Sequence, residues 1–208
     1  MAQQERAVKT RRHIVEAAAE EFAERGYEAA TCANIASRAG VTRGAFYFHF
    51  TSKNDVAGAV LSEWIARQPT AGPLPFKLQE LMERAMATAR QLKDDPVVNG
   101  CFRLCLEEGL GVGERQRPYL IWSDRYKELL ESAREQGALH PDAVTSETAE
   151  LLIGAFAGAR LASQILPEGA DVEQRVVSFL RHLLPHVATP QSVARLGLTP
   201  PAGPYADD

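Results

Sequence analysis

Apolar residues recur every three to four positions along almost the whole chain, which is the spacing of one face of an α-helix. No stretch shows the alternation of apolar and polar residues, bounded by turn residues, that is typical of a β-strand. The pattern therefore predicts an all-α protein. Beyond the first fifty or so residues, helices are expected over 54–68, 76–93, 97–109, 117–136, 145–165 and 171–187.

Capping signals divide the N-terminal part of the chain into three helices. The first is expected over 5–25, with Gly26 as its stop. Thr31 and Thr42 suit the N-caps of two short helices, because a threonine hydroxyl accepts a hydrogen bond from a backbone N–H in the first turn. The apolar residues expected to pack in these three helices are Ile14, Ala18, Phe22, Ala33, Ile35, Ala36, Ala39, Phe46 and Phe50.

Proline and glycine mark the connections between the later helices. The segment 69–75, PTAGPLP, is expected to be a connection, and 109–118, GLGVGERQRP, a loop between two helices. The polar, proline-rich segment 199–208, TPPAGPYADD, is expected to be a poorly ordered tail.

Two short helices joined by an Ala-Gly turn, with a longer helix before them, match the helix-turn-helix plan. In that plan the second short helix enters the major groove of DNA. In its sequence, RGAFYFHF, Phe46 and Phe50 are four apart and are expected to face inward. Arg43 and Tyr47 are also four apart and share another face. The spacing thus separates a packing face from a face available to DNA.

The distribution of charge changes what the composition implies. The formal net charge of the chain is −4, which at first argues against a phosphate-rich partner. However, 29–54 contains no carboxylate, and 1–55 carries eight basic and seven acidic side chains, so the acidity lies in the rest of the chain. A second carboxylate-free segment, 6–12, contains Arg6, Lys9, Arg11 and Arg12.

An isolated aromatic cluster such as FYFHF is more often plain core. Here Arg43 begins the helix, Tyr47 and His49 follow one turn later, and Lys53 stands just beyond, a set suited to phosphate and base contacts. The small residues Gly44 and Ala45 let the helix N-terminus come close to the groove floor. The residues expected to contact DNA are Thr31, Thr42, Arg43, Gly44, Ala45, Tyr47, Phe48, His49 and Lys53.

These motifs resemble the N-terminal DNA-binding domain of the TetR family of transcriptional regulators. The resemblance rests on GYEAAT at 26–31 and IASRAGVTRGAFYFHFTSKNDV at 35–56. Within that family the chain looks most like the γ-butyrolactone autoregulator receptors. The motif GALYFHF is common in those proteins, and in this chain Phe46 replaces its leucine. The resemblance implies a repressor that a small signalling molecule releases from a pseudo-palindromic operator, in the control of secondary metabolism or antibiotic production.

The resemblance continues more thinly into the second half, in segments such as PYLIW at 118–122 and LLIGAFAGARLASQ at 151–164. It implies that Trp122 lines a pocket for a lactone or furan, and Tyr119, three residues earlier, is placed to face the same cavity. Trp64 stands where members often carry a polar residue such as glutamine. The ligand-binding candidates are Trp64, Leu81, Phe102, Cys105, Tyr119, Trp122, Ile153 and Phe156, and for each aliphatic candidate plain core packing is the alternative.

A homodimer is expected through residues 145–187. The Gly/Ala-rich face of GAFAGARLAS at 154–163 permits close helix approach, and 171–187 offers a second apolar face, so two helices from each subunit suit a four-helix interface. Burial inside one subunit is the alternative. The domains predicted are a helix-turn-helix DNA-binding domain at 1–54 and a helical ligand-binding and dimerisation domain at 55–198.

Other classes of function find little support. The chain lacks GxSxG, HExxH and P-loop motifs, so no enzyme, metal or cofactor is expected. It also lacks a spanning apolar run and an N-terminal signal sequence, and its three cysteines show no CxxC spacing, so we expect a cytoplasmic protein with buried thiols and no membrane contact. A purely structural helical adaptor would leave the basic and aromatic set around Tyr47 unexplained. A regulator of an efflux or catabolic gene that senses an antibiotic or other hydrophobic compound is the alternative function.

Overall fold

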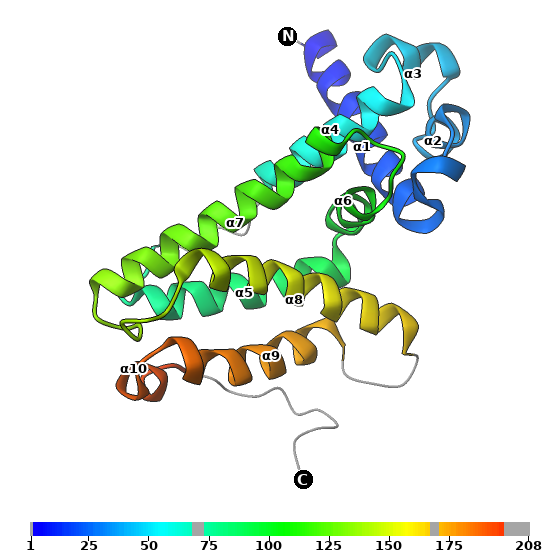
Figure 1. Cartoon of the computed structure of the whole chain (residues 1–208). Coiled ribbons are helices and arrows are strands. Elements are labelled where there is room, and N and C mark those ends of the chain that lie inside the picture. The colour runs from blue at the N-terminus through cyan, green and yellow to red at the C-terminus, as the bar shows by residue number, and fades with distance from the viewer. Residues whose placement is uncertain (1, 68–72, 167–170, 198–208) are drawn as a thin grey trace. The chain divides into compact units, whose positions relative to one another are not determined.

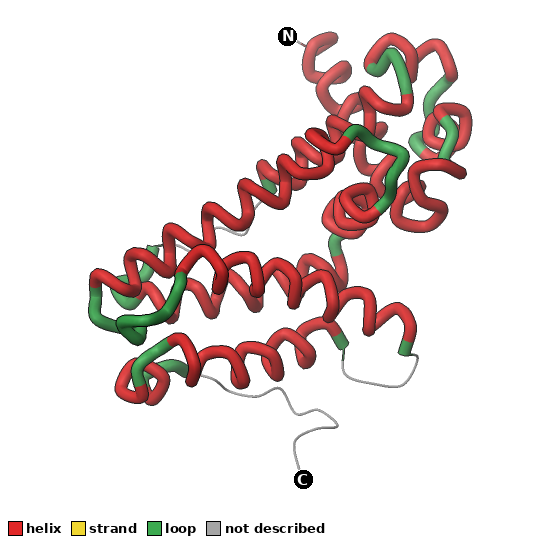
Figure 2. The backbone as a smooth tube through the Cα atoms, in the orientation of Figure 1, coloured by secondary structure: helices red, strands yellow, loops and turns green. Residues whose placement is uncertain are grey.

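The computed structural model describes residues 2–67, 73–166 and 171–197. These ranges contain helices and loops and no strand (Figure 2), apart from one isolated antiparallel bridge between Leu139 and Ala188. The all-α prediction is confirmed. The helices are α1 (Ala2–Ala29), α2 (Cys32–Arg38), α3 (Arg43–His49), α4 (Lys53–Ala66), α5 (Lys77–Asp94), α6 (Pro96–Leu106), α7 (Val112–Glu135), α8 (Thr145–Ile165), α9 (Val172–Val187) and α10 (Pro190–Ala194) (Figure 1).

The chain forms two compact units. The first contains Met1–Gln68 and Asp95–Pro118, and the second contains Pro69–Asp94 and Tyr119–Asp208, so the boundary crosses α7. The functional division at residue 54 remains a prediction. The expected tail at 199–208 lies outside the described residues.

The first unit is built around α1, which packs against α2, α4 and α6. The contact between α1 and α6 is close, because a Cβ added at Gly100 would lie 2.3 Å from the carbonyl oxygen of Ala19. Only glycine fits that approach. Fully buried Ile14, Phe22 and Leu104 fill the core of the unit.

Both predicted N-caps of the short helices are confirmed. The Thr31 hydroxyl accepts from the Asn34 N–H, and the Thr42 hydroxyl accepts from the Ala45 N–H, each at 3.1 Å. Gly26 has the non-helical angles φ 79° and ψ 172° and interrupts α1, which then continues for one short turn to Ala29. A glycine at a positive φ is the usual way for a helix to end.

Two local predictions are wrong, and one short helix was not predicted. Ala33 is exposed and not a packing residue, because Ile35 and Ala36 supply the buried face of α2. The loop expected up to residue 118 ends early, since α7 begins at Val112 and contains Pro118. The Glu114 carboxylate accepts from the Gly111 N–H at 3.2 Å and caps the helix start, which the proline signal concealed. The short helix α10 was not expected at all.

The second unit holds α5, α8 and α9 packed together, with α10 against α9. Its core includes the fully buried Leu78, Leu92, Leu152 and Leu180. Within the described ranges we find no helix with the length and apolar character needed to cross a membrane.

Candidate nucleic-acid interface and small-molecule site

Helix α3 separates a buried face from an exposed one, as the sequence predicts. Phe46 is fully buried and Phe50 is 1% exposed, and their rings lie 6.0 Å apart. On the other side Tyr47 is 43% exposed and Phe48 is 80% exposed. A large aromatic side chain left in water on a short, capped helix is typical of a surface that meets a partner.

Polar and small residues surround these exposed rings. The Arg43 guanidinium lies over the Tyr47 ring, 5.6 Å from its centroid, which keeps a cation on the exposed face. The nearest described atom that a Cβ at Gly44 would meet is the Thr42 hydroxyl, 3.9 Å away. The packing of the helix itself does not require glycine there, so the bare backbone is available to a partner. Thr31, Thr42, Arg43 and Gly44 are exposed, and Ala45 and His49 are half-buried.

Helix α2 is fixed to α1 by a charged cluster. Arg38 donates to Glu24 at 2.8 Å and lies 3.1 Å from Glu21, which is 2% exposed. Glu20 lies 3.4 Å away on the same side. The hydrogen bond to Arg38 lowers the pKa of Glu24 and raises the pKa of Arg38. Arg38 therefore holds α2 in place, and its charge is balanced within the unit.

Lys53 has contacts inside the first unit. Its Nζ donates to the carbonyl oxygens of Tyr27 at 2.6 Å and Glu28 at 3.2 Å, and it lies 4.3 Å from the centroid of the Tyr27 ring. An ammonium has three N–H groups, so at most one is left for a phosphate. Lys53 thus joins the start of α4 to the end of α1, which the sequence pattern did not indicate.

A second connection, missed by sequence reasoning, comes from α6. The Glu107 carboxylate accepts from the Tyr27 N–H at 2.5 Å and from Arg103 Nε at 2.8 Å. Arg103 also donates to the carbonyl oxygens of Ala23 and Glu24, at 2.9 and 3.0 Å. These groups satisfy the exposed backbone at the end of α1. A movement of α6 would therefore be passed to the helix on which α2 and α3 rest.

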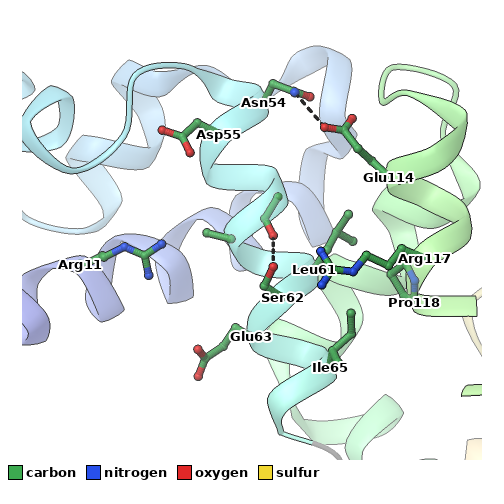
Figure 3. Close-up of a pocket in the computed structure, with 12 residues that line it drawn as sticks. Arg11, Asn54, Asp55, Leu61, Ser62, Glu63, Ile65, Glu114, Arg117 and Pro118 are labelled. Carbon is green, nitrogen blue, oxygen red and sulfur yellow. Dashed lines mark hydrogen bonds between the residues drawn. The ribbon is translucent and has the colours of Figure 1, made fainter. Parts of the chain in front are cut away.

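A cleft of about 610 Å³ lies in the first unit and is lined by α1, α4 and the start of α7. Figure 3 shows the side chains that line it. Asn54 donates to Glu114 at 3.1 Å across it, and Arg11 and Arg117 approach it from α1 and α7. None of the eight ligand-binding candidates lines this cleft. It is therefore distinct from the pocket expected from the sequence.

The ligand candidates of the second unit gather around an aromatic group. Trp122 on α7 and Phe156 on α8 are 4% and 2% exposed, and their rings meet edge to face at 6.2 Å. Tyr126, one turn after Trp122, lies 5.8 Å from Phe156. Its hydroxyl is 3.3 Å from that of Thr88 on α5, and burial raises the pKa of Tyr126. Leu81 and Ile153 are also buried in this unit.

Sequence reasoning missed Thr88 and Tyr126, although the four-residue spacing from Trp122 to Tyr126 was available as a signal. Tyr119 is 41% exposed whereas Trp122 is 4% exposed, and their expected position on one cavity stays a prediction. The remaining candidates lie in the first unit. There Trp64 on α4 is buried, and Phe102 and Cys105 on α6 are half-buried.

An apolar surface runs along α8 in the second unit. This surface is formed by exposed uncharged residues that are three or four positions apart: Leu151, Gly154, Gly158, Leu161 and Ile165. We call this set the α8 stripe. No described atom lies within 4 Å of a Cβ added at either glycine. Beside the stripe is a groove of about 540 Å³ between α8 and α9, where the Nε and Nη2 atoms of Arg175 are buried without a described hydrogen-bond partner.

Comparisons with known proteins show which family the chain is similar to. Residues 14–60 match the family of bacterial regulatory proteins of the tetR type. The A-factor receptor protein of Streptomyces griseus is 34% identical over 199 residues, which cover 94% of this chain and 70% of that protein.

Solved structures are similar over almost the full length. The TetR regulator TylP from Streptomyces fradiae has 40% identity and a TM-score of 0.83, with 93% of each chain covered. An ArpA-like γ-butyrolactone receptor has 27% identity and a TM-score of 0.71, with 91% of this chain and 93% of that chain covered. CprB of Streptomyces coelicolor, in complex with its operator sequence, has 30% identity and a TM-score of 0.74, with 91% and 94% covered. The chain therefore belongs to the TetR family and is a helix-turn-helix transcriptional regulator.

Proposed function

We propose that this regulator is a homodimeric repressor that a small hydrophobic signalling molecule releases from a pseudo-palindromic operator. The observation that carries the proposal is the exposed face of α3, where Arg43, Tyr47 and Phe48 reach solvent from a helix anchored by Phe46. The ligand we propose is of the γ-butyrolactone, butenolide or furan type, and the genes controlled are those of secondary metabolism or antibiotic production.

The chemistry of α3 suits the edges of base pairs in the major groove. An arginine at the start of the helix can donate two hydrogen bonds to a guanine, and an exposed phenylalanine can contact a thymine methyl group. We assign these roles to Arg43 and Phe48. The hydroxyls of Thr31, Thr42 and Tyr47 and the ring of His49 are suited to phosphates, while Gly44 and Ala45 allow the backbone to approach.

The α8 stripe supports dimerisation through residues 145–187. Exposed leucine and isoleucine separated by glycines give a smooth apolar surface, and the same surface on a second copy is complementary to it under two-fold symmetry. A dimer also presents two copies of α3. Two recognition helices about 34 Å apart, or a multiple of that distance, read a pseudo-palindromic site.

The aromatic group of the second unit supports a ligand that is mainly apolar with a few polar atoms. Trp122 and Phe156 offer ring faces and edges, and the Thr88 and Tyr126 hydroxyls provide a buried polar pair. The A-factor receptor and the γ-butyrolactone receptor among the similar proteins favour the lactone class. One similar structure, 32% identical, concerns control of antibiotic production by bacterial hormones, which agrees with the proposed target genes.

Release requires the ligand to bind one conformation more tightly than the other. We propose that the ligand-bound conformer places the two α3 helices at a spacing that no longer fits the operator, with α4 as the transmitting helix. The contacts of Arg103 and Glu107 with the end of α1 give α6 a second route to the same helices.

A mobility-shift assay with DNA from upstream of the protein's own gene tests this function. We expect a discrete complex that dissociates when a γ-butyrolactone, butenolide or furan is added. Trp122→Ala should bind the same DNA and no longer respond to the ligand. Release by an antibiotic but by no lactone, butenolide or furan would instead favour the regulator of an efflux or catabolic gene, and an unchanged response of Trp122→Ala would refute the assigned pocket.

A further inference from the structure

The first three turns of α1 extend beyond the core of the first unit. From residue 4 to residue 13 no side chain is buried, and the first buried one is Ile14. At a rise of about 1.5 Å per residue, this part of the helix projects roughly 15 Å past the last packed turn. Core packing within the described part of the unit therefore does not explain why the helix extends this far.

The projecting segment is strongly basic. It carries Arg6, Lys9, Arg11 and Arg12 against the single carboxylate of Glu5. Like charges three or four positions apart repel each other on a helix, which destabilises it. Two of these residues have contacts, since Arg12 pairs with Glu16 at 3.0 Å and Arg11 lies over the Phe50 ring at 4.9 Å. Among the described residues, no ion pair is formed by Arg6 or Lys9.

Arg6 and Lys9, which we call the basic stripe, lie on one side of α1. With His13 they follow the spacing i, i+3, i+7, which places all three residues on that side of the helix. Glu24 is about five full turns after Arg6 and therefore lies on the same side. Glu24 contacts Arg38 at 2.8 Å, so this side faces α2, the first helix of the helix-turn-helix.

The basic stripe also lies at the end of the first unit that carries α3. The beginning of α1 and α3 are at the same end of the first unit (Figure 1), and Arg11 contacts the residue that directly follows α3. A polyanion bound to α3 would therefore extend past the stripe. We propose that Arg6 and Lys9 are a second DNA-binding site, which contacts backbone phosphates beside the base pairs read by α3.

This site rests on the proposed function, because it assumes that α3 binds DNA. Its role differs from that of α3: contacts to phosphates carry no sequence information, so the stripe strengthens binding to operator and unrelated DNA alike. Binding to phosphates also reduces the repulsion between the basic side chains at the start of α1. Each phosphate contact contributes about 0.9 to the slope of log affinity against log salt concentration.

The test compares salt titrations of the full-length protein on operator DNA. For R6A/K9A we expect a slope smaller in magnitude by about 2 per subunit and about 4 for the dimer, so that the ratio of wild-type to variant affinity falls about a hundredfold between about 50 mM and about 200 mM salt. Alanine preserves the helix, and R6Q/K9Q, which keeps longer side chains, should give the same result. Circular dichroism confirms that both variants are folded.

The matched control is R90A/K127A, which removes the same charge from two exposed residues of the second unit. It should keep the wild-type slope. If R6A/K9A also keeps that slope, or if the control lowers it equally, the phosphate site is refuted. If the wild-type protein forms no specific complex with any promoter DNA, the proposed function itself fails, which is a different result.

Discussion

The exposed face of α3 and the α8 stripe both leave large apolar side chains in water, but their surroundings differ. The Phe48 ring meets the His49 ring edge to face at 5.1 Å, and the Arg43 guanidinium lies over the ring of the neighbouring Tyr47. Along α8, two leucines and an isoleucine flank a pair of glycines, and no charge lies within the stripe. Exposed apolar side chains that lie together indicate a contact surface. The neighbouring chemistry distinguishes a surface suited to a polyanion from one suited to a second copy of the chain.

The two surfaces also differ in how they are supported. Helix α3 has seven residues and depends on its cap and on Phe46 to keep its shape. Helix α8 has twenty-one residues and a buried face of its own, so its stripe does not depend on a single anchor. The comparison therefore predicts that one core substitution would remove the first surface, whereas the second is altered most by a change on the surface itself.

The largest effect is expected within α3. Phe46→Ala should destabilise the first unit by about 3–5 kcal/mol, because it removes a fully buried ring from a packed core. Urea unfolding followed by circular dichroism measures this change. DNA binding should be lost together with the fold.

Tyr47→Ala, the neighbouring exposed aromatic, is the control for this prediction. Its unfolding midpoint should stay close to the wild-type value, while its affinity for the operator decreases. A loss of stability in Tyr47→Ala as large as that in Phe46→Ala would show that α3 has no separate buried and exposed faces.

The second prediction concerns the α8 stripe. Leu161→Glu places a charge at the centre of the proposed dimer interface and should raise the dimer dissociation constant by about thirtyfold or more, since central interface residues contribute at least ~2 kcal/mol. Sedimentation equilibrium measures the constant. Leu120→Glu, at a similarly exposed leucine of α7, should leave it unchanged. An equal effect of both substitutions would contradict the assignment of the interface to α8.

These two surfaces show what the sequence can predict. The spacing of Phe46, Phe50, Arg43 and Tyr47 was enough to separate the faces of α3, because local helical geometry decides which residues share a side. The capping threonines were equally readable, since an N-cap bond spans three residues. Helix α8 was predicted with its observed bounds, Thr145–Ile165, from periodicity alone.

Contacts between residues far apart in the chain were not predictable in this way. Lys53 pairs with carbonyl oxygens about 25 positions earlier, and Glu107 with the Tyr27 N–H, 80 positions away. The sequence gives no local signal for either partner, and the charge of Lys53 alone indicates a phosphate contact. The start of α7 was missed for another reason, since Pro118 is usually a sign of a helix boundary and here lies inside the helix.

The third prediction tests the polar chemistry of the α3 surface. Arg43→Ala should weaken operator binding by about 1–3 kcal/mol and relax the preference at one base pair, if the guanidinium reads a guanine. Binding measured on operators with single base-pair changes shows this as a flattened preference at one position. Lys127→Ala, an exposed lysine of the second unit, should change neither property. A uniform loss on all sequences would assign Arg43 to a phosphate instead of a base.

The smallest effect on stability is expected at the contact between Glu24 and Arg38, which joins α2 to α1. Because the hydrogen bond from Arg38 lowers the pKa of Glu24 from its ordinary value of 4.5, the charged carboxylate is favoured in the folded state. The stabilisation is present at neutral pH and is lost as the pH falls through the lowered folded value. Glu24→Gln should therefore unfold at a slightly lower urea concentration than wild type at pH 7, and at the same concentration once the pH is below that lowered folded value.

The exposed Glu28, four residues later and also on α1, provides the control for the Arg38 contact. Glu28→Gln should match the wild-type urea midpoint at both pH values, because no ion pair of this side chain occurs in the described part of the chain. If Glu24→Gln and wild type differ equally at neutral and acid pH, the effect comes from packing and not from charge. In that case the charge of Glu24 would add nothing to the frame that presents α3, and Arg38 would hold α2 through Glu20 and Glu21 alone.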